Sequence, residues 1–91
     1  MAMTDVAFKI EEERVVQALQ EAGEKLDRAE GEVVLDFSSV RRVDVNALRA
    51  LEEFAGLAQD KGVKAVLRGV NIGVYKVLKL MKLGSRFSFV N

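Results

Sequence analysis

Residues 32–60 predict a strand, a loop and a helix, in that order. Residues 33–37 are β-branched at their start and too few for a buried helix, so they are typical of a central strand with apolar side chains on both faces. Asp44 then precedes a segment with helical periodicity that extends to about Asp60. Its carboxylate can accept hydrogen bonds from the free N–H groups of the first helical turn. The rest of the chain is expected to pack around this unit.

Three further segments have strand-like patterns. Residues 6–10 alternate between apolar and polar side chains, which is typical of a half-buried strand at the edge of a sheet. Residues 64–68 form a third short strand. Residues 87–90 either add a final strand or simply lay Phe87 and Phe89 on the core.

Two more segments have apolar residues at helical spacing. One runs from Glu11 to near Gly31, and the other runs from Asn71, which can cap the helix, to Gly84. The inward face of the last helix is expected to consist of Val74, Val77, Leu78 and Met81, with its lysines on the solvated side. Strands that alternate with helices predict a single α/β domain over residues 1–91. Its four-stranded sheet should be mostly parallel and packed with about three to four helices.

Composition argues against several classes of function. The chain has no Cys and no His, so thiolate metal sites, the commonest metal ligand and the commonest general base are all missing. We therefore expect no cofactor, no metal and no enzymatic activity, because no nucleophile, base and orienting group can be assembled. The 14 basic residues are matched by 14 acidic ones and balanced by them locally, so we expect no nucleic-acid partner.

The start of the chain and its apolar runs bear on localisation. Residues 1–8 carry neither the basic region nor the apolar run of a signal peptide. No apolar run approaches the roughly 20 residues that span a bilayer. We therefore expect a cytoplasmic protein that is not embedded in a membrane.

The segment from about Gly31 to Val90 resembles the STAS domain family, named after sulfate transporters and bacterial anti-sigma factor antagonists. The resemblance rests on a strand that ends in Leu-Asp-Phe-Ser, on a Val-Asp pair that opens a leucine-rich helix, and on a last helix reading Val-Leu-Lys-Leu-Met-Lys-Leu-Gly-Ser-Arg-Phe. It implies a small α/β domain with a mixed sheet that binds proteins and does not catalyse a reaction.

The resemblance also identifies the position of a regulatory switch. In antagonist members of the family, a Ser or Thr directly after the Asp that begins the second helix is phosphorylated by a partner kinase, and the phosphate controls partner binding. A phosphate adds about −1.5 to −2 charges at a helix N-terminus, which changes an interaction surface strongly. Here Asp44 is present, but the acceptor position holds Val45 and Asn46 follows it. Val45 is a degenerate phosphorylation position, so the usual phosphoswitch cannot operate.

The predicted partner-binding surface surrounds the start of this second helix. Val45 and Leu57 point away from the predicted core, and Val45 lies where the family meets its partners. For Asp44, capping is favoured over a catalytic or metal-binding role. Arg41 and Arg42, in the loop before this helix, could hold a phosphate or a partner carboxylate, or could be a solvated pair. The surface comprises Arg41, Arg42, Asp44, Val45, Asn46, Arg49 and Glu53.

Several kinds of partner fit the resemblance. The first is a kinase-like anti-sigma factor. The second is the ATPase of a bacterial phospholipid-transport ABC complex, in which the chain would be a fixed structural subunit. A small-ligand or lipid carrier is a third hypothesis, without convergent polar groups to support it. Compared with the family, one strand is missing at the N-terminal edge of the sheet, so a homodimer could form through that edge.

Overall fold

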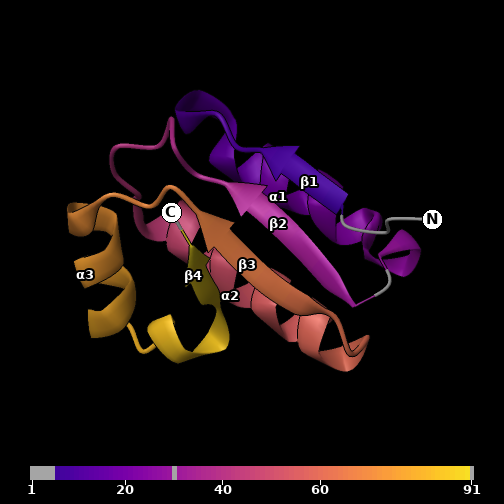
Figure 1. Cartoon of the computed structure of the whole chain (residues 1–91). Coiled ribbons are helices and arrows are strands. Elements are labelled where there is room, and N and C mark those ends of the chain that lie inside the picture. Colours follow the sequence, from indigo (N-terminus) through magenta and orange to yellow (C-terminus); the bar gives the residue numbers. More distant parts are fainter. Residues whose placement is uncertain (1–5, 30, 91) are drawn as a thin grey trace.

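The strands of the sheet lie side by side in the order in which they occur in the chain. The computed structural model describes residues 6–29 and 31–90. The strands β1 (Val6–Lys9), β2 (Glu32–Asp36), β3 (Lys64–Arg68) and β4 (Ser88–Val90) form one sheet in the order β1-β2-β3-β4 (Figure 1). All three neighbouring pairs are parallel. The prediction of a four-stranded, mostly parallel α/β sheet is confirmed, and residues 88–90 do form the final strand. The described strands are all parallel, whereas the resemblance implies a mixed sheet.

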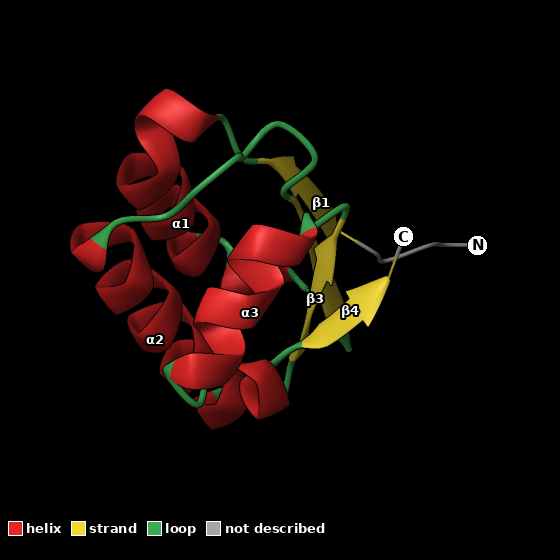
Figure 2. Cartoon of the chain, turned by 90° about the vertical axis from the view of Figure 1, so that its left-hand side faces the viewer, coloured by secondary structure: helices red, strands yellow, loops and turns green. Residues whose placement is uncertain are grey.

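In the described part of the chain, three α-helices cover one face of the sheet. They are α1 (Val15–Glu24), α2 (Val45–Asp60) and α3 (Ile72–Leu80). Figure 2 shows all three on the same side of the strands. Right-handed crossovers that step in one direction across a parallel sheet place every helix on one face. α1 is shorter than the helix predicted from Glu11 to near Gly31. Short 3-10 turns at Glu12–Arg14 and Leu26–Arg28 take the place of its first and last parts.

The register of β2 and β3 gives the two faces of the sheet different chemistry. On the side of the helices, the residues of these strands are apolar and buried: Val33, Leu35, Ala65 and Leu67. On the open side, opposite charges meet at both ends and two valines meet in the middle: Glu32 with Lys64, Val34 with Val66, and Asp36 with Arg68. Of the two charged pairs, Asp36 and Arg68 form an ion pair at 3.5 Å. The open face of β2 is therefore apolar only at its centre.

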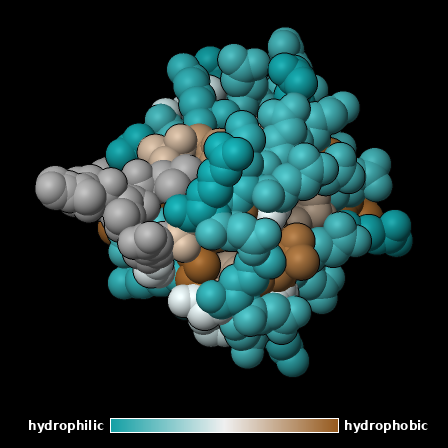
Figure 3. All heavy atoms as spheres, turned by 90° about the vertical axis from the view of Figure 1, so that its right-hand side faces the viewer, coloured by the Kyte–Doolittle hydropathy of each residue, from teal (hydrophilic) through white to brown (hydrophobic). Residues whose placement is uncertain are grey.

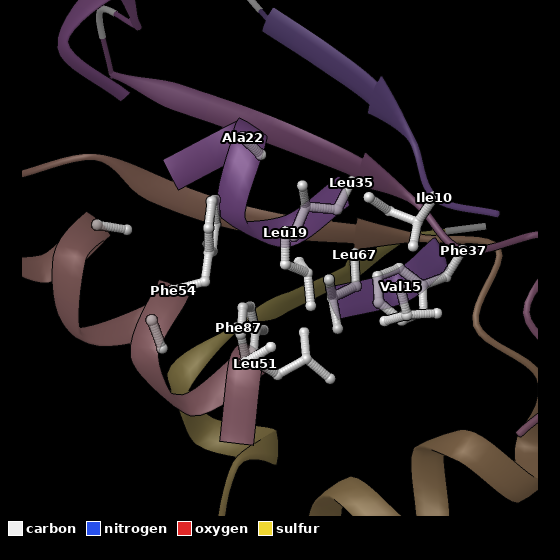
Figure 4. Packing of buried hydrophobic residues seen from close by; sticks show 14 of the residues in the cluster. Ile10, Val15, Leu19, Ala22, Leu35, Phe37, Leu51, Phe54, Leu67 and Phe87 are labelled. Atoms are coloured by element: carbon white, nitrogen blue, oxygen red, sulfur yellow. The ribbon is translucent and has the colours of Figure 1, made fainter. Parts of the chain in front are cut away.

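The core lies between the sheet and the three helices. Figure 4 shows side chains from α1, α2 and the central strands pointing toward one another, among them Leu19, Leu35, Leu51 and Leu67. All four are at most 2% exposed. Burying a side chain of this size contributes about 1.5–3 kcal/mol. Phe87 also reaches the core, as predicted.

The last helix ends earlier than predicted. It ends at Leu80 and not at Gly84, because Lys82 adopts a φ of 62° and turns the chain. As a result Met81, which was predicted on the core face, is 55% exposed, whereas Leu83 is buried. The prediction for Met81 was wrong because helical periodicity does not continue through such a turn. Val74 and Leu78 are buried as predicted.

Candidate protein-binding site at the start of α2

Side chains from two distant segments hold the loop between β2 and α2. Glu12, which precedes α1, accepts a hydrogen bond from the backbone N–H of Arg41 at 2.5 Å. Asn71, the N-cap of α3, donates from Nδ2 to the carbonyl oxygens of Arg41 at 3.0 Å and Val40 at 3.4 Å. The same Asn71 accepts the N–H of Val74 at 2.8 Å. The start of α2 is therefore fixed relative to both α1 and α3.

Asp36 stabilises the beginning of this loop. Hydrogen bonds from the Ser38 side chain and backbone N–H, with the Arg68 guanidinium beside the carboxylate, lower the pKa of Asp36 from its ordinary value and outweigh the opposite effect of desolvation. Behind this turn, a Cβ on Gly69 would lie 2.9 Å from the Ser38 Cβ, and Gly69 has a φ of 75°. Only glycine fits that position without strain.

Asp44 and Val45 form the helix start itself. Oδ1 of Asp44 accepts a hydrogen bond from the N–H of Ala47 at 2.8 Å, so the predicted cap is confirmed. Val45 is the first residue of α2, and its side chain is 64% exposed. An aliphatic group thus projects into solvent at the position that the resemblance in sequence assigned to a phosphorylatable residue.

Two hollows flank this helix start. The hollow toward α1 measures about 350 Å³ and is rich in charged groups, including Glu12, Glu13, Arg42 and Asp44. The hollow toward α3 measures about 250 Å³ and is mostly apolar; it is lined by Val45, Leu48, Arg49, Glu52, Met81 and Leu83. The first turns of α2 therefore form a ridge between a charged hollow and an apolar one.

The residues of the predicted partner-binding surface do not all line the two hollows. All seven predicted residues are exposed, but Asn46, Glu53 and Arg41 line neither hollow. Leu57 is exposed as predicted but lies away from Val45, since its Cδ1 would be 3.2 Å from a Cβ on Gly23 of α1.

Sequence reasoning missed the part of the site that α3 contributes. It assigned Met81 to the core, and it gave Glu12 no contact with the loop. An earlier end for the last helix would have indicated the exposure of Met81. No local signal pointed to Glu12, because its partner is a backbone N–H 29 residues away.

Neither metal binding nor membrane insertion finds support in residues 6–29 and 31–90. In this part of the chain, no group of three or more His, Cys, Asp or Glu side chains is arranged to hold a metal ion. None of its helices has the length and apolar character needed to cross a membrane.

Comparisons with known proteins place this geometry in a family. A family model described as "Mlab, STAS domain" matches residues 12–90. A Ser-to-Glu variant of RsbS from Moorella thermoacetica is 26% identical over 99% of this chain and 80% of its own, with a TM-score of 0.78. A chain from the stressosome, described as a signal integration and transduction hub, is 27% identical over 99% of this chain and 84% of its own, with a TM-score of 0.77.

A more distant structure has the same fold. A sulfate transporter family protein from Wolinella succinogenes is 20% identical over 98% of this chain and 79% of its own, with a TM-score of 0.80. None of the curated proteins compared with the chain matches it. The family model covers most of the sequence, and the chain belongs to the STAS domain family.

Proposed function

We propose that this STAS domain is a non-enzymatic docking module that binds a regulatory protein through the start of α2. The observation that carries the proposal is the exposure of Val45 on a helix start whose position is fixed by Glu12 and Asn71. An apolar group held in one place loses little conformational freedom when a partner covers it, so its burial contributes efficiently to affinity.

The proposal assigns a role to each predicted residue. Asp44 shapes the helix start, Val45 and Asn46 form the contact, and charged groups frame it: Arg41, Arg42, Arg49 and Glu53. Because Val45 carries no hydroxyl, binding is constitutive or is governed by the partner. The partner proposed first is a kinase-like anti-sigma factor in the cytoplasm, since the stressosome chain and the RsbS variant are among the similar structures.

A Val45→Glu substitution tests the contact. It places a charge where the partner covers an apolar group, and we expect affinity to fall at least about tenfold. Val90→Glu is the matched control, because Val90 is also exposed but lies on β4. Both variants should retain the thermal unfolding midpoint within a few degrees. Unchanged affinity of Val45→Glu for the native partner would refute the contact.

A second candidate is a fixed structural subunit of a phospholipid-transport ABC complex. The observation that favours it is the matching family model, which is named after Mlab and not after an anti-sigma factor antagonist. A tagged pull-down from native cells, with mass spectrometry of stoichiometric partners, separates the candidates. A kinase-like anti-sigma factor supports the first and an ABC ATPase the second. Pairing of two copies through β1 stays a prediction, which analytical ultracentrifugation tests.

A further inference from the structure

Charge is segregated along the chain although the net charge is zero. All 14 acidic residues lie at or before Asp60, whereas seven of the 14 basic residues follow it. The sequence-based statement that acids balance the bases locally is therefore wrong for the last third of the chain. This third includes all of α3 and the turn after it.

The outward face of α3 combines this positive charge with exposed apolar groups. Ile72, Lys76, Lys79 and Leu80 share one side of the helix at the spacing of an α-helix, opposite the buried Val74 and Leu78. Ile72 is 72% exposed and Leu80 is 81% exposed. For comparison, the end of the molecule remote from α3, which faces the viewer in Figure 3, is largely hydrophilic with small apolar patches.

The apolar hollow connects this face of α3 to the start of α2. Met81 follows Leu80 directly, and it lines the same hollow as Val45 and Leu48. Exposed apolar groups therefore occur both in the hollow, at Val45 and Met81, and next to it on α3, at Leu80.

The turn after α3 keeps a lysine in a strained conformation. Helices α2 and α3 end with the same hydrogen bond, from Val63 N–H to the Ala58 carbonyl and from Leu83 N–H to the Leu78 carbonyl, each at 2.8 Å. At the left-handed position of this motif α2 has Gly62, with a φ of 68°, whereas α3 has Lys82, with a φ of 62°. Glycine is unstrained there and lysine is not. The chain thus keeps an exposed positive charge directly after Met81 at the expense of stability.

We infer, on the basis of the docking function proposed above, that the partner presents an acidic amphipathic segment that lies across α2 and α3. One apolar side chain of the segment enters the hollow between Val45 and Met81. Its carboxylates lie along Lys76, Lys79 and Lys82. Charge complementarity supports this occupant, because every charged side chain in the last third of the chain is positive.

A protein segment fits this surface better than an anionic membrane does. The apolar groups near α2 line a hollow of about 250 Å³, which suits a single inserted side chain, whereas a bilayer surface is flat. Arg49 also lines this hollow and can pair with a carboxylate of the segment.

Photo-cross-linking in the native cells tests the inference. A photo-reactive residue is introduced in place of Leu80, in place of Val45 or, as a control, in place of the exposed Gln20 on α1. The cross-linked species are then sequenced by mass spectrometry. We expect positions 80 and 45 to capture one protein, through a segment in which Asp and Glu alternate with apolar residues at helical spacing, and position 20 to capture no such segment.

The outcomes separate this inference from the proposed function. Capture from position 45 without capture from position 80 overturns the inference and leaves the α2 contact standing. Capture from position 80 alone refutes the contact at Val45 and also overturns the inference, which requires the segment to reach α2. Lipid adducts at position 80, or a captured segment without acidic residues, overturn the inference. If neither position captures a protein, both the inference and the proposed contact at α2 are overturned.

A charge reversal supplies a second measurement with the captured partner. Lys76→Glu should lower the association rate about tenfold at low salt, with the difference shrinking as salt is added. Lys64→Glu makes the same change in charge at an exposed site on β3 and should alter the rate less than about twofold. Equal effects of the two variants would contradict a partner segment that lies on α3.

Discussion

Asn71 is the residue on which the position of the candidate site most depends, and its replacement by serine isolates that role. Serine caps a helix about as well as asparagine, so the hydrogen bond to the N–H of Val74 can be kept. The amide donors to the carbonyls of Arg41 and Val40 are lost. No formal charge changes. The variant therefore measures the connection between α3 and the loop before α2, separately from the cap.

The two lost hydrogen bonds determine the magnitude. A hydrogen bond contributes roughly 0.5–1.5 kcal/mol net. The bond at 3.0 Å has good length and the bond at 3.4 Å is long, so the first should dominate. We expect Asn71→Ser to lower the free energy of unfolding by about 1–2 kcal/mol. Asn71→Ala also removes the cap, so it should lower it by about 1 kcal/mol more.

Urea unfolding followed by circular dichroism provides the measurement, with Asp44→Ser as the matched control. That substitution keeps a cap at the start of α2 but removes a charge that interacts with the helix dipole. In about 1 M salt this interaction is screened, so Asp44→Ser should remain within about 0.5 kcal/mol of the wild type. Equal stabilities of Asn71→Ser and Asp44→Ser under these conditions would refute the claim that Asn71 holds the loop.

Three further predictions concern stability. Asp44→Ala removes the cap on Ala47 and should destabilise the domain by about 1 kcal/mol relative to Asp44→Ser in the same urea titration; a difference near zero would exclude a capping role. Lys82→Gly relieves the left-handed strain and should raise the thermal midpoint by a few degrees, and a lower midpoint in calorimetry would contradict it. The lowered pKa of Asp36 means that its stabilisation is fully present above about pH 4, the unfolded value, and is lost as pH falls through the folded pKa. The stability gap between wild type and Asp36→Asn should therefore narrow in acid, and a gap independent of pH would exclude the Ser38 and Arg68 interactions as its cause.

The elements of this fold follow from local patterns that the sequence displays openly. The short apolar run at β2, the cap at Asp44 and the cap at Asn71 all depend on neighbours within a few residues, so they could be predicted. The buried faces of α1 and α2 follow from helical periodicity in the same way. The early end of α3 could not be predicted, because a lysine in the left-handed conformation has no sequence signature comparable to that of glycine.

The site was less predictable than the fold, because tertiary contacts build it. The exposure of Val45 follows from its place on the helical wheel, and the sequence indicated it. The apolar hollow requires Met81 and Leu83 from a segment more than 30 residues away, and the loop before α2 is held by Glu12 and Asn71. No local pattern contains these pairings.

The order of the strands has a consequence for synthesis on the ribosome. Each strand joins the edge formed by the strand before it, so no strand has to wait for a later segment to be inserted between its neighbours. At about 5–20 residues per second, successive strands emerge a few seconds apart, and each helix can dock before the next strand arrives. The domain can therefore be assembled from its N-terminus as it is translated, with one growing edge exposed until β4 is added.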